Sequence, residues 1–408
     1  MTVAWRPAEI VAPPAERCFL FLQGLPGPFF RRLGAALRAR GARVLRVNLN
    51  GGDVADWPGG IAFRGRPRDW PAWLAALIAA RGVTDIVLFG DSRPLHLAAR
   101  RLAAVRGLPV HVFEEGYLRP DWVTLETGGV NGHSSLPRDL AAVRAAAAGL
   151  PPVSELPAIP GNFPRRARES VRYYAATLAL RPGFPHGRGH RPAGPLTEGM
   201  AWLRRFARRR GEARATATGL ARVAGGRYFV LPLQLDSDSQ LRVHSPFASM
   251  AAALRHVVAS FIAHAPPGTR LLVKQHPLDP GLLDWAALTA AAAGDAGDRI
   301  VFIPGGAIEA IVAAAAGVVT VNSTTGTLAL AQGVPVKVLG TAVYDIAGIT
   351  SSAGLDAFWA DPGRVDAAAY AALRRLLVHR SLIHGGFHSD DGLARLVAGA
   401  CDRLLGAA

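Results

Sequence analysis

Apolar positions along the first third of the chain form short, nearly continuous runs separated by amphipathic segments. The runs lie at 18–24, 43–50, 85–91 and 110–116. Between them, residues 28–41 and 67–82 have the pattern of amphipathic helices. Apolar strands that alternate with such helices are typical of a parallel sheet covered by helices on both faces.

The same alternation returns later in the chain, after an interruption rich in proline, glycine and arginine. The later apolar runs lie at 227–236, 270–277, 299–305, 317–326 and 334–340, and a last helical pattern covers 390–407. The chain therefore predicts an α/β fold with two Rossmann-like domains that face each other across a cleft. We assign 1–150 to the first domain, 151–225 to a basic helical linker, 226–385 to the second domain and 386–408 to a closing helix.

Polar residues gather where the predicted strands end. These clusters are Gln23 with Gly24, Asn50 to Asp53, Asp91 with Ser92, Glu114 with Glu115, Asp236 to Asp238, Lys274 to His276, and Asn322 to Thr325. Ligands of open α/β sheets bind outside the carboxyl ends of the strands. Loops that only connect elements would not place polar groups there so regularly, so the pattern predicts an enzyme cleft.

The formal charge of +16 requires an explanation. The chain has no zinc-ligand spacing, helix-turn-helix pattern or aromatic signature of RNA binding, so we expect no nucleic-acid partner. Arginines lie beside aromatic residues in 165–191 and 202–222. Such segments suit the headgroup layer of an anionic membrane face, or they are solvated basic helix faces.

No run of about 18 apolar residues is present, and the first residues lack the basic-then-apolar order of a signal peptide. We therefore expect a cytoplasmic protein. Cys18 and Cys401 have no metal-ligand spacing and are interpreted as packed thiols rather than a disulfide.

Two C-terminal segments suit a phosphate group. In 318–333 a buried strand leads through a hydroxyl-rich turn into a helix that begins near Thr325, where main-chain N–H groups and hydroxyls can meet an anion. The purely structural alternative is that one of these residues is an N-cap. In 271–277, Lys274 and His276 end a strand. Together the segments predict a two-sided phosphate clamp, whose residues are Lys274, His276, Asn322, Ser323, Thr324 and Thr325.

The segment 233–240 contains an Asp-Ser-Asp sequence at a strand end. A short acidic pattern of this kind binds a metal in some enzymes, but it is also common in turns. We interpret it as a structural or nucleotide-contacting turn, expect no metal or other cofactor, and place Gln234, Asp236 and Asp238 on the donor side.

The glycine-rich segments 22–29 and 48–53 lack the full spacing of a dinucleotide fingerprint. Glycine allows close backbone approach, so we interpret these loops as the lining of an acceptor pocket. The residues assigned to the acceptor side are Gln23, Gly24, Asn50, Gly51, Asp53, Asp91 and Ser92.

Two adjacent carboxylates, Glu114 and Glu115, end the apolar run at 110–116. One of them is a candidate base or nucleophile, and the other is held by hydrogen bonds or by Arg119. Alternation along a strand sends the two side chains to opposite faces, so only one should point at a given ligand.

Taken together, these motifs resemble the capsular polysaccharide biosynthesis family of β-Kdo glycosyltransferases. The similarity covers most of the chain and includes LQGLPGPFFRRL, VNLNGGD, FEEGYLRPDWVTLE, GVNGHSSLPRD, LPLQLDSDSQ, VKQHP, NSTTGTLAL and YDIAGIT. The resemblance implies a GT-B fold, CMP-Kdo as the donor, no metal, and a reaction at the cytoplasmic face of the inner membrane. It also implies an anionic phospholipid acceptor of the lysophosphatidylglycerol type and other capsule biosynthesis proteins as partners.

The resemblance assigns roles to particular residues. His276, Ser323 and Thr324 would bind the CMP phosphate. Glu115 would be the nucleophile of a retaining mechanism, although the related enzymes have aspartate at this position. From its spacing and charge alone, Arg119 is expected to neutralise the Kdo carboxylate or to orient a glutamate. Glu114 faces the other way along the strand and is expected to brace the turn or the linker.

Two alternatives remain open. One is another GT-B enzyme that uses a UDP- or CMP-linked sugar, such as a sialyltransferase-like enzyme or an epimerase. The other is a non-catalytic capsule-assembly protein.

Overall fold

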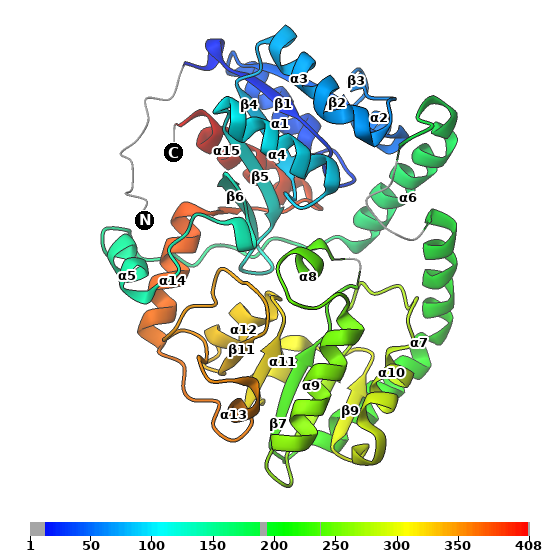
Figure 1. Cartoon of the computed structure of the whole chain (residues 1–408), viewed down its shortest axis with the longest axis vertical. Coiled ribbons are helices and arrows are strands. Elements are labelled where there is room, and N and C mark those ends of the chain that lie inside the picture. The colour runs from blue at the N-terminus through cyan, green and yellow to red at the C-terminus, as the bar shows by residue number, and fades with distance from the viewer. Residues whose placement is uncertain (1–12, 188–193, 237, 407–408) are drawn as a thin grey trace. The chain divides into compact units, whose positions relative to one another are not determined.

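The computed structural model describes residues 13–187, 194–236 and 238–406, and it divides into two compact α/β units (Figure 1). The first unit comprises residues 1–135, 154–190 and 380–408, and the second comprises 136–153 and 191–379. Each unit has its own sheet. The predicted α/β class with two Rossmann-like domains is confirmed.

The sheet of the first unit has the strand order β12-β6-β5-β4-β1-β2-β3. Its strands are β1 (Cys18–Phe21), β2 (Arg43–Asn48), β3 (Ile61–Ala62), β4 (Asp85–Phe89), β5 (Val110–Glu115), β6 (Trp122–Thr127) and β12 (Leu382–His384). β1 to β5 are parallel and follow the 3-2-1-4-5 order of a Rossmann fold. β6 and β12 extend the sheet with antiparallel pairings.

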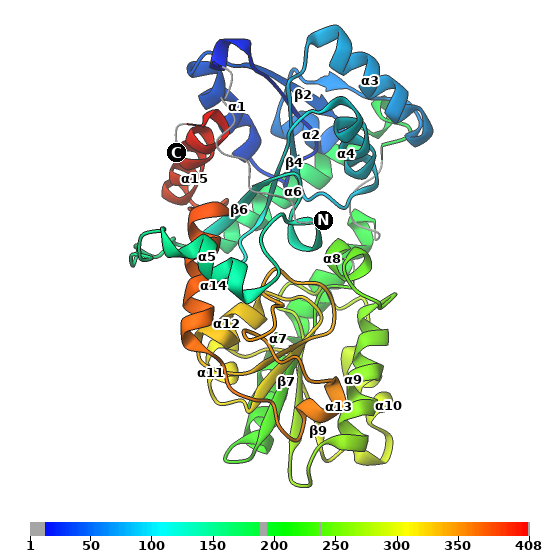
Figure 2. The ribbon, with the colours of Figure 1, turned by 60° about the vertical axis from the view of Figure 1, so that its left-hand side comes forward.

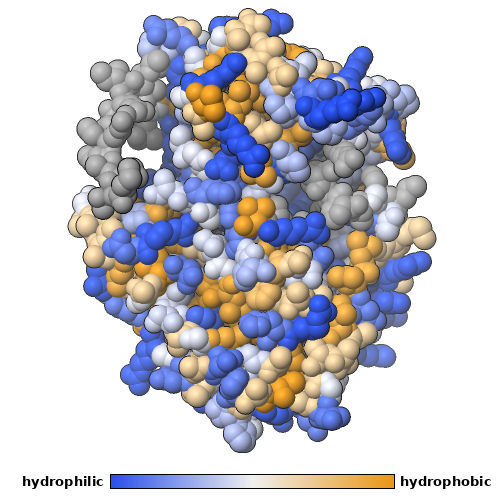
Figure 3. All heavy atoms as spheres, in the orientation of Figure 1, coloured by the Kyte–Doolittle hydropathy of each residue, from blue (hydrophilic) through white to orange (hydrophobic). Residues whose placement is uncertain are grey.

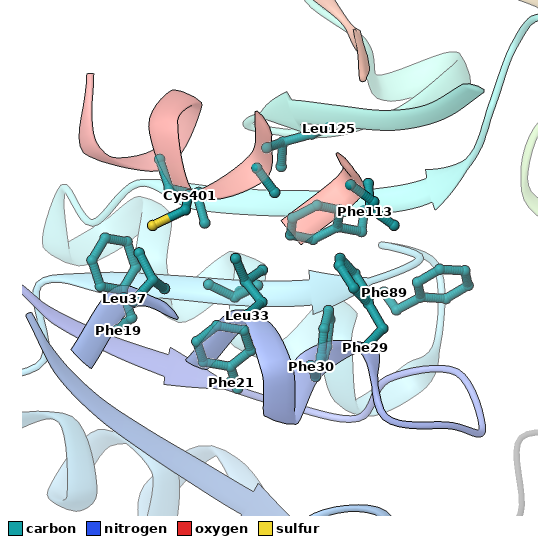
Figure 4. Packing of buried hydrophobic residues seen from close by; sticks show 14 of the residues in the cluster. Phe19, Phe21, Phe29, Phe30, Leu33, Leu37, Phe89, Phe113, Leu125 and Cys401 are labelled. Carbon is teal, nitrogen blue, oxygen red and sulfur yellow. The ribbon is translucent and has the colours of Figure 1, made fainter. Parts of the chain in front are cut away.

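Helices pack on this sheet and bury its apolar side chains. They are α1 (Phe29–Ala39), α2 (Gly51–Asp56), α3 (Trp70–Arg81), α4 (Pro94–Arg106), α6 (Phe163–Ala179) and α15 (Asp390–Leu405). α15 lies beside α1 (Figure 2). Phenylalanines of β1, α1, β4 and β5 form the core beneath them, and Cys401 of α15 packs there as a buried thiol (Figure 4). Each fully buried large apolar side chain contributes about 1.5–3 kcal/mol.

The second unit has a five-stranded, fully parallel sheet in the order β11-β10-β7-β8-β9. The strands are β7 (Tyr228–Pro232), β8 (Arg270–Lys274), β9 (Ile300–Ile303), β10 (Gly317–Thr320) and β11 (Val336–Val338). This is again the 3-2-1-4-5 order. The strands are short and almost wholly buried, as expected for a sheet covered on both faces.

The helices of the second unit include one long helix, α7. They are α5 (Leu140–Ala148), α7 (Pro195–Val223), α8 (Ser239–Val243), α9 (Met250–His264), α10 (Trp285–Ala293), α11 (Ile308–Ala313), α12 (Thr325–Ala331), α13 (Leu355–Phe358) and α14 (Ala367–Arg380). α9, α10 and α13 enclose a core around Phe229, Phe261 and Trp359. α7 packs on β9, where Gly219 is so close that a β-carbon would lie 2.4 Å from Ile303.

The boundaries of the two units differ from the predicted domain ranges. The predicted linker 151–225 is divided, because α6 packs on α2 in the first unit and α7 packs on β9 in the second. The predicted closing helix belongs to the first unit, and so does β12, which had been included in the range 226–385. A strand of three residues is too short to give a periodic signal, so sequence patterns could not reveal this return of the chain.

Within the described residues, no helix is both long and apolar enough to cross a membrane. On the face shown in Figure 3, hydrophilic residues are spread over both units. Hydrophobic residues form separate patches among the hydrophilic ones.

Candidate functional site

Both sheets contain a point at which the direction of strand succession reverses. In the first unit it lies between β1 and β4, and in the second it lies between β7 and β10. The connections from these neighbouring strands run to opposite sides, which leaves a crevice at their carboxyl ends. These two places are where each unit is expected to bind a ligand.

At the reversal point of the first sheet, Gln23 after β1 meets Arg93 after β4. Arg93 Nη1 donates to Gln23 Oε1 at 3.2 Å and to the main-chain oxygen of Gly24 at 3.3 Å. Sequence patterns missed Arg93, although it directly follows Asp91 and Ser92 at a strand end. Its guanidinium lies where this fold binds ligands.

The glycine-rich loop after β2 packs against helix α6. A β-carbon on Gly51 would lie 2.2 Å from the main-chain oxygen of Ala176, and one on Gly52 would lie 2.6 Å from the ring of Tyr173. Asn50 Nδ2 donates to the Tyr173 hydroxyl at 2.9 Å. The two glycines therefore allow α6 to pack closely against this loop. An acceptor pocket at the loop stays a prediction.

Asp53, also assigned to the acceptor side, is almost fully buried and forms an ion pair with Arg46 at 3.0 Å. Its Oδ2 accepts the Leu49 main-chain N–H at 2.9 Å, and the Tyr173 hydroxyl donates to its Oδ1 at 3.2 Å. A buried carboxylate with this many donors is fixed in place. Asp53 therefore joins β2, α2 and α6 at the carboxyl ends of the strands.

Asp91, two residues beyond β4, is fully buried and holds the segment that follows β6. Its Oδ2 accepts the Val130 main-chain N–H at 3.1 Å and lies 3.0 Å from His133 Nδ1, while Ser92 Oγ donates to Oδ1 at 2.9 Å. Arg100 Nη1 is 3.6 Å away. Burial raises the pKa of the Asp91 carboxyl, but these hydrogen bonds and the Arg100 charge outweigh it and lower the pKa overall. Asp91 is therefore ionised.

The adjacent carboxylates at the end of β5 meet different partners. Glu114 Oε1 accepts the Glu115 main-chain N–H at 3.0 Å, and its Oε2 lies toward Gly90 at the end of β4. Glu115 forms ion pairs with Arg119 and, at 3.6 Å, with Arg166 of α6. The contact with Arg119 that the four-residue spacing suggested is present.

A tight turn after Glu115 reverses the chain into β6. A β-carbon on Gly116 would lie 2.1 Å from the main-chain oxygen of Trp122, so only glycine fits. Glu115 pairs with Val123 in the sheet, and Thr124 Oγ1 donates to the Glu115 main-chain oxygen at 3.2 Å. The Glu115 backbone is therefore held against β6.

The charge of Arg119, followed by that of Arg166, lowers the pKa of Glu115 to about 2. A carboxylate with so low a pKa is a poor general base at neutral pH, because a base is most effective when its pKa is near the working pH. It is ionised at neutral pH, which is the state that a nucleophile or a charge partner requires. Arg166 could not be found from sequence because it is remote in the chain and belongs to a segment that looked like a linker.

Charged contacts link α6 to α2 and to the segment before α15. Arg165 pairs with Glu169 at 3.0 Å, and His388, just before α15, lies 3.2 Å from Glu169. One turn further along α6, Arg172 pairs with Asp56 of α2. The first unit thus gathers charged groups from β5, α2, α6 and the segment before α15, and the carboxylates Glu169 and Asp56 among them are buried.

In the second unit, Gln234 after β7 and Asn322 after β10 bridge the reversal point with two hydrogen bonds. Gln234 Nε2 donates to Asn322 Oδ1 at 2.7 Å, and the Asn322 main-chain N–H donates to Gln234 Oε1 at 3.1 Å. Both residues were assigned to the donor side, and the structure brings them together.

The predicted turn before α12 is present, and the helix begins at Thr325. Ser323 Oγ accepts the Thr325 main-chain N–H at 3.2 Å, which closes the turn before the helix, but the N-cap residue, Thr324, makes no side-chain capping bond, so the simple N-cap alternative is not observed. The Tyr344 hydroxyl donates to the Ser323 main-chain oxygen. The Thr324 side chain makes no capping bond to α12 and is half-buried. The turn is thus fixed by its own hydrogen bonds, and phosphate binding there stays a prediction.

Lys274 is the last residue of β8, and His276 lies two residues further along the chain. Lys274 is buried, and burial lowers its pKa. His276 Nδ1 accepts the Leu278 main-chain N–H at 3.1 Å, so a neutral ring carries its proton on Nε2, the atom suited to donate to a phosphate oxygen. Arg205 of α7, which sequence patterns missed as a site residue, donates to the Pro277 main-chain oxygen at 3.0 Å.

The acidic pair after β7 serves the local fold. Asp236 Oδ1 accepts the Met250 main-chain N–H at 2.8 Å at the beginning of α9, and the Asp238 main-chain N–H donates to Leu235 at 2.9 Å. Negative charge at a helix N-terminus is favourable. The turn is therefore structural on these contacts.

Comparisons with known proteins identify the family. The model of the capsule polysaccharide biosynthesis protein family matches residues 84–388. The chain belongs to this family.

Related proteins match over nearly the whole chain. It is 32% identical over 379 residues to the capsule polysaccharide export protein KpsS of Escherichia coli, covering 91% of this chain and 96% of that protein. It is 33% identical over 383 residues to the capsule polysaccharide modification protein LipB of Neisseria meningitidis, covering 91% of each. Among solved structures, KpsC of Thermosulfurimonas dismutans, a β-Kdo 2,7 transferase, aligns over 94% of this chain and 99% of that one. The sequence identity there is 14% and the TM-score is 0.47.

Proposed function

We propose that the protein is a retaining β-Kdo transferase that moves Kdo from CMP-Kdo to an anionic lipid of the lysophosphatidylglycerol type. The observation that carries the proposal is Glu115, an ionised carboxylate at the carboxyl end of β5, held by Arg119 and Arg166. Membership of the capsule family supports the substrate class.

The proposed reaction has two displacements. A Glu115 carboxylate oxygen attacks the anomeric carbon of Kdo, the bond to the CMP phosphate breaks, and its electron pair leaves with CMP. The acceptor hydroxyl oxygen then attacks the same carbon and its proton is released to solvent, while the ester bond breaks and its electron pair returns to Glu115. Two inversions give net retention. The arginines keep Glu115 ionised before the first step and stabilise the returning charge after the second.

In the second unit, the proposed contacts with CMP are polar groups at the ends of β8 and β10. His276 Nε2 and the hydroxyl of Thr324 would donate hydrogen bonds to the phosphate, and the Lys274 ammonium would balance its charge. The bond pattern of Gln234 and Asn322 holds the turn in place before a ligand arrives.

Helix α7 offers a surface for the lipid acceptor's membrane. Its side chains Met200, Leu203 and Phe206 are 56%, 70% and 54% exposed, and the same part of the helix carries several arginines. Apolar side chains flanked by arginine suit an anionic headgroup layer. Sedimentation with anionic vesicles, weakened by high salt, would support this role, and equal binding to neutral vesicles would contradict it.

The deciding experiment is incubation of the full chain with CMP-Kdo and a lysophosphatidylglycerol analogue. We expect release of CMP and a lipid product heavier by one or more Kdo residues, with β linkage by NMR. CMP-sialic acid and UDP-N-acetylglucosamine serve as competing donors. Turnover of one of these in place of CMP-Kdo would contradict the proposal, and so would the absence of any transfer.

A further inference from the structure

Arg93 lies at the reversal point of the first sheet and is only partly engaged by the protein. Its Nη1 donates to Gln23 Oε1 at 3.2 Å and to the Gly24 main-chain oxygen at 3.3 Å. Within the part of the chain that the structure describes, Nη2 and Nε have no hydrogen-bond acceptor, and no carboxylate forms an ion pair with the guanidinium. The side chain is half-buried rather than enclosed, so a ligand can reach it.

Two buried arginines of the same unit show how the protein otherwise satisfies such a charge. Arg17 forms an ion pair with Asp85. Arg46 forms one with Asp53 at 3.0 Å. Arg93 is in a similar position but has no such partner, and burial lowers the pKa of its guanidinium, although arginine keeps its charge. Because a buried charge without a counter-ion is costly, the surroundings of Arg93 would be completed by an anion.

The nearby acidic side chains leave this position open. The charges of Glu114 and Asp53 act on Arg93, but neither forms an ion pair with it. Asp53 is paired with Arg46, and Glu114 Oε1 accepts the Glu115 main-chain N–H at 3.0 Å. The edge of the guanidinium formed by Nε and Nη2 is therefore available.

The geometry of this edge suits an oxyanion. Arginine binds phosphate or carboxylate groups through two parallel N–H bonds. The bonds from Nη1 to Gln23 and Gly24 orient the guanidinium before a ligand arrives. Helix α4 begins at the next residue, Pro94, so the positive end of the helix also lies here.

We propose that Arg93 binds the phosphate of the acceptor's headgroup and so holds the acceptor for the second displacement. This rests on the proposed function. β4 and β5 are neighbouring parallel strands, so Arg93 and Glu115 both lie at the carboxyl edge of the first sheet. In a lysophosphatidylglycerol-type acceptor, glycerol carbons separate the phosphate from the hydroxyls that can react. Arg93 therefore binds at a distance from the reacting carbon.

The test crosses the Arg93 side chain with the charge of the acceptor. Lysophosphatidylglycerol carries the phosphate, monoacylglycerol has glycerol hydroxyls without it, and an octyl Kdo glycoside carries only a carboxylate. For Arg93→Gln we expect kcat/KM with lysophosphatidylglycerol to fall about 10–100-fold, as when a charged hydrogen-bonded contact is lost. The value with monoacylglycerol should change less than about threefold. Arg93→Lys keeps the charge without the fork, so its loss should be smaller.

Controls separate anion binding from a structural role. Arg101→Gln removes an exposed arginine of the same helix, and every acceptor should be used as by wild type. Release of CMP from CMP-Kdo without acceptor should stay within about threefold of wild type in Arg93→Gln, because the acceptor takes no part in the first displacement. Denaturant unfolding of Arg93→Gln should show unchanged or higher stability, because the charge it removes has no ion-pair partner.

A binding measurement needs no reaction. By calorimetry without CMP-Kdo, glycerophosphoglycerol, the deacylated headgroup, should bind about 10–100-fold more weakly to Arg93→Gln than to wild type.

Three results with the acceptors would overturn the inference. They are undiminished use of lysophosphatidylglycerol by Arg93→Gln, an equal loss with monoacylglycerol, and a loss confined to the octyl Kdo glycoside, which would make a carboxylate the ligand. Equal binding of glycerophosphoglycerol by wild type and Arg93→Gln would also overturn it. Failure of wild-type protein to consume CMP-Kdo would instead contradict the proposed function, so the two failures are distinguished.

Discussion

The two sheets have the same strand order but different chemistry at their carboxyl ends. In each, a glutamine follows the first strand and meets a residue that follows the fourth: Gln23 with Arg93 in the first unit, and Gln234 with Asn322 in the second. Beyond this shared feature, the first unit gathers ion pairs, and the second gathers amide and hydroxyl groups with one buried lysine.

If the protein is the transferase that we propose, this difference would divide the work between the two units. Bond making and proton transfer need groups whose ionisation is fixed by neighbours, as Arg119 and Arg166 fix Glu115. Holding a phosphate would need donors that are already oriented, and the Gln234–Asn322 bonds and the Ser323 bond to Thr325 fix the turn in which the proposed donors lie. The same backbone topology serves both purposes because the residues after the strands, not the strands, differ.

The largest expected effect tests this division at Glu115. Glu115→Gln removes the proposed nucleophile, so transfer should fall at least about 10³-fold and no Kdo adduct should appear in the intact mass. Glu114→Gln is the matched control. It keeps the pairs with Arg119 and Arg166, and we expect a loss of less than about tenfold. A larger loss in Glu114→Gln than in Glu115→Gln would reverse the roles of the two carboxylates.

The second prediction concerns a buried ion pair that stabilises the fold and takes no part in the proposed reaction. At the amino ends of β1, β4 and β5, Asp85 is buried and bonded to Arg17 and His111. Burial raises the pKa of the Asp85 carboxyl, but the His111 and Arg17 hydrogen bonds outweigh it and lower the pKa to about 2. Asp85→Asn should cost about 2–3 kcal/mol of unfolding free energy at pH 7.

The direction of the Asp85 pKa shift determines how this stabilisation changes with pH. The folded-state pKa lies below the ordinary value, so the stabilisation is present at neutral pH and is lost as the pH falls from about 4 towards about 2. Denaturant unfolding should therefore show wild type and Asp85→Asn converging over that range. Asp402→Asn, which breaks an exposed pair with Arg40, should cost less than about 0.5 kcal/mol. A parallel offset of Asp85→Asn at every pH would contradict the account.

Sequence patterns predicted the parallel strands because apolar runs and turn residues are local signals. They located Glu115, Arg119 and the helix start at Thr325 for the same reason. They did not reveal β12 or the contact of Arg166 with Glu115, since both depend on segments remote in the chain.

Asp53 shows a case in which the sequence suggested a ligand-binding residue and the structure shows contacts within the protein. It lies at a strand end in a glycine-rich loop, but its carboxylate forms an ion pair with Arg46 and accepts a hydrogen bond from Tyr173. Local sequence does not show which polar residue at a strand end is already satisfied by a partner.

The third prediction concerns the second unit. Lys274→Met removes a buried ammonium whose pKa is lowered by burial. If the ammonium balances the phosphate charge, CMP should bind about 10–100-fold more weakly by calorimetry, equivalent to about 1.4–2.7 kcal/mol. Stability should be unchanged or higher, because a buried charge is costly to desolvate. Unchanged CMP affinity would remove Lys274 from the phosphate site.

The smallest expected effects come from the two glutamines, and they test the comparison most directly. Gln234→Ala removes both bonds to Asn322, which loosens the turn before α12. We expect the KM for CMP-Kdo to rise about tenfold with little change in kcat, as when an interaction that is equal in the ground state and the transition state is lost.

Gln23→Ala frees Arg93 and loses the contacts with Asp53 and Tyr173. There kcat should fall by a similar factor with little change in the KM for CMP-Kdo, if the groups that this glutamine supports act in the transition state as proposed. If both variants changed KM alone, the division of labour between the two sheets would be wrong, since the first sheet would then also serve only to bind.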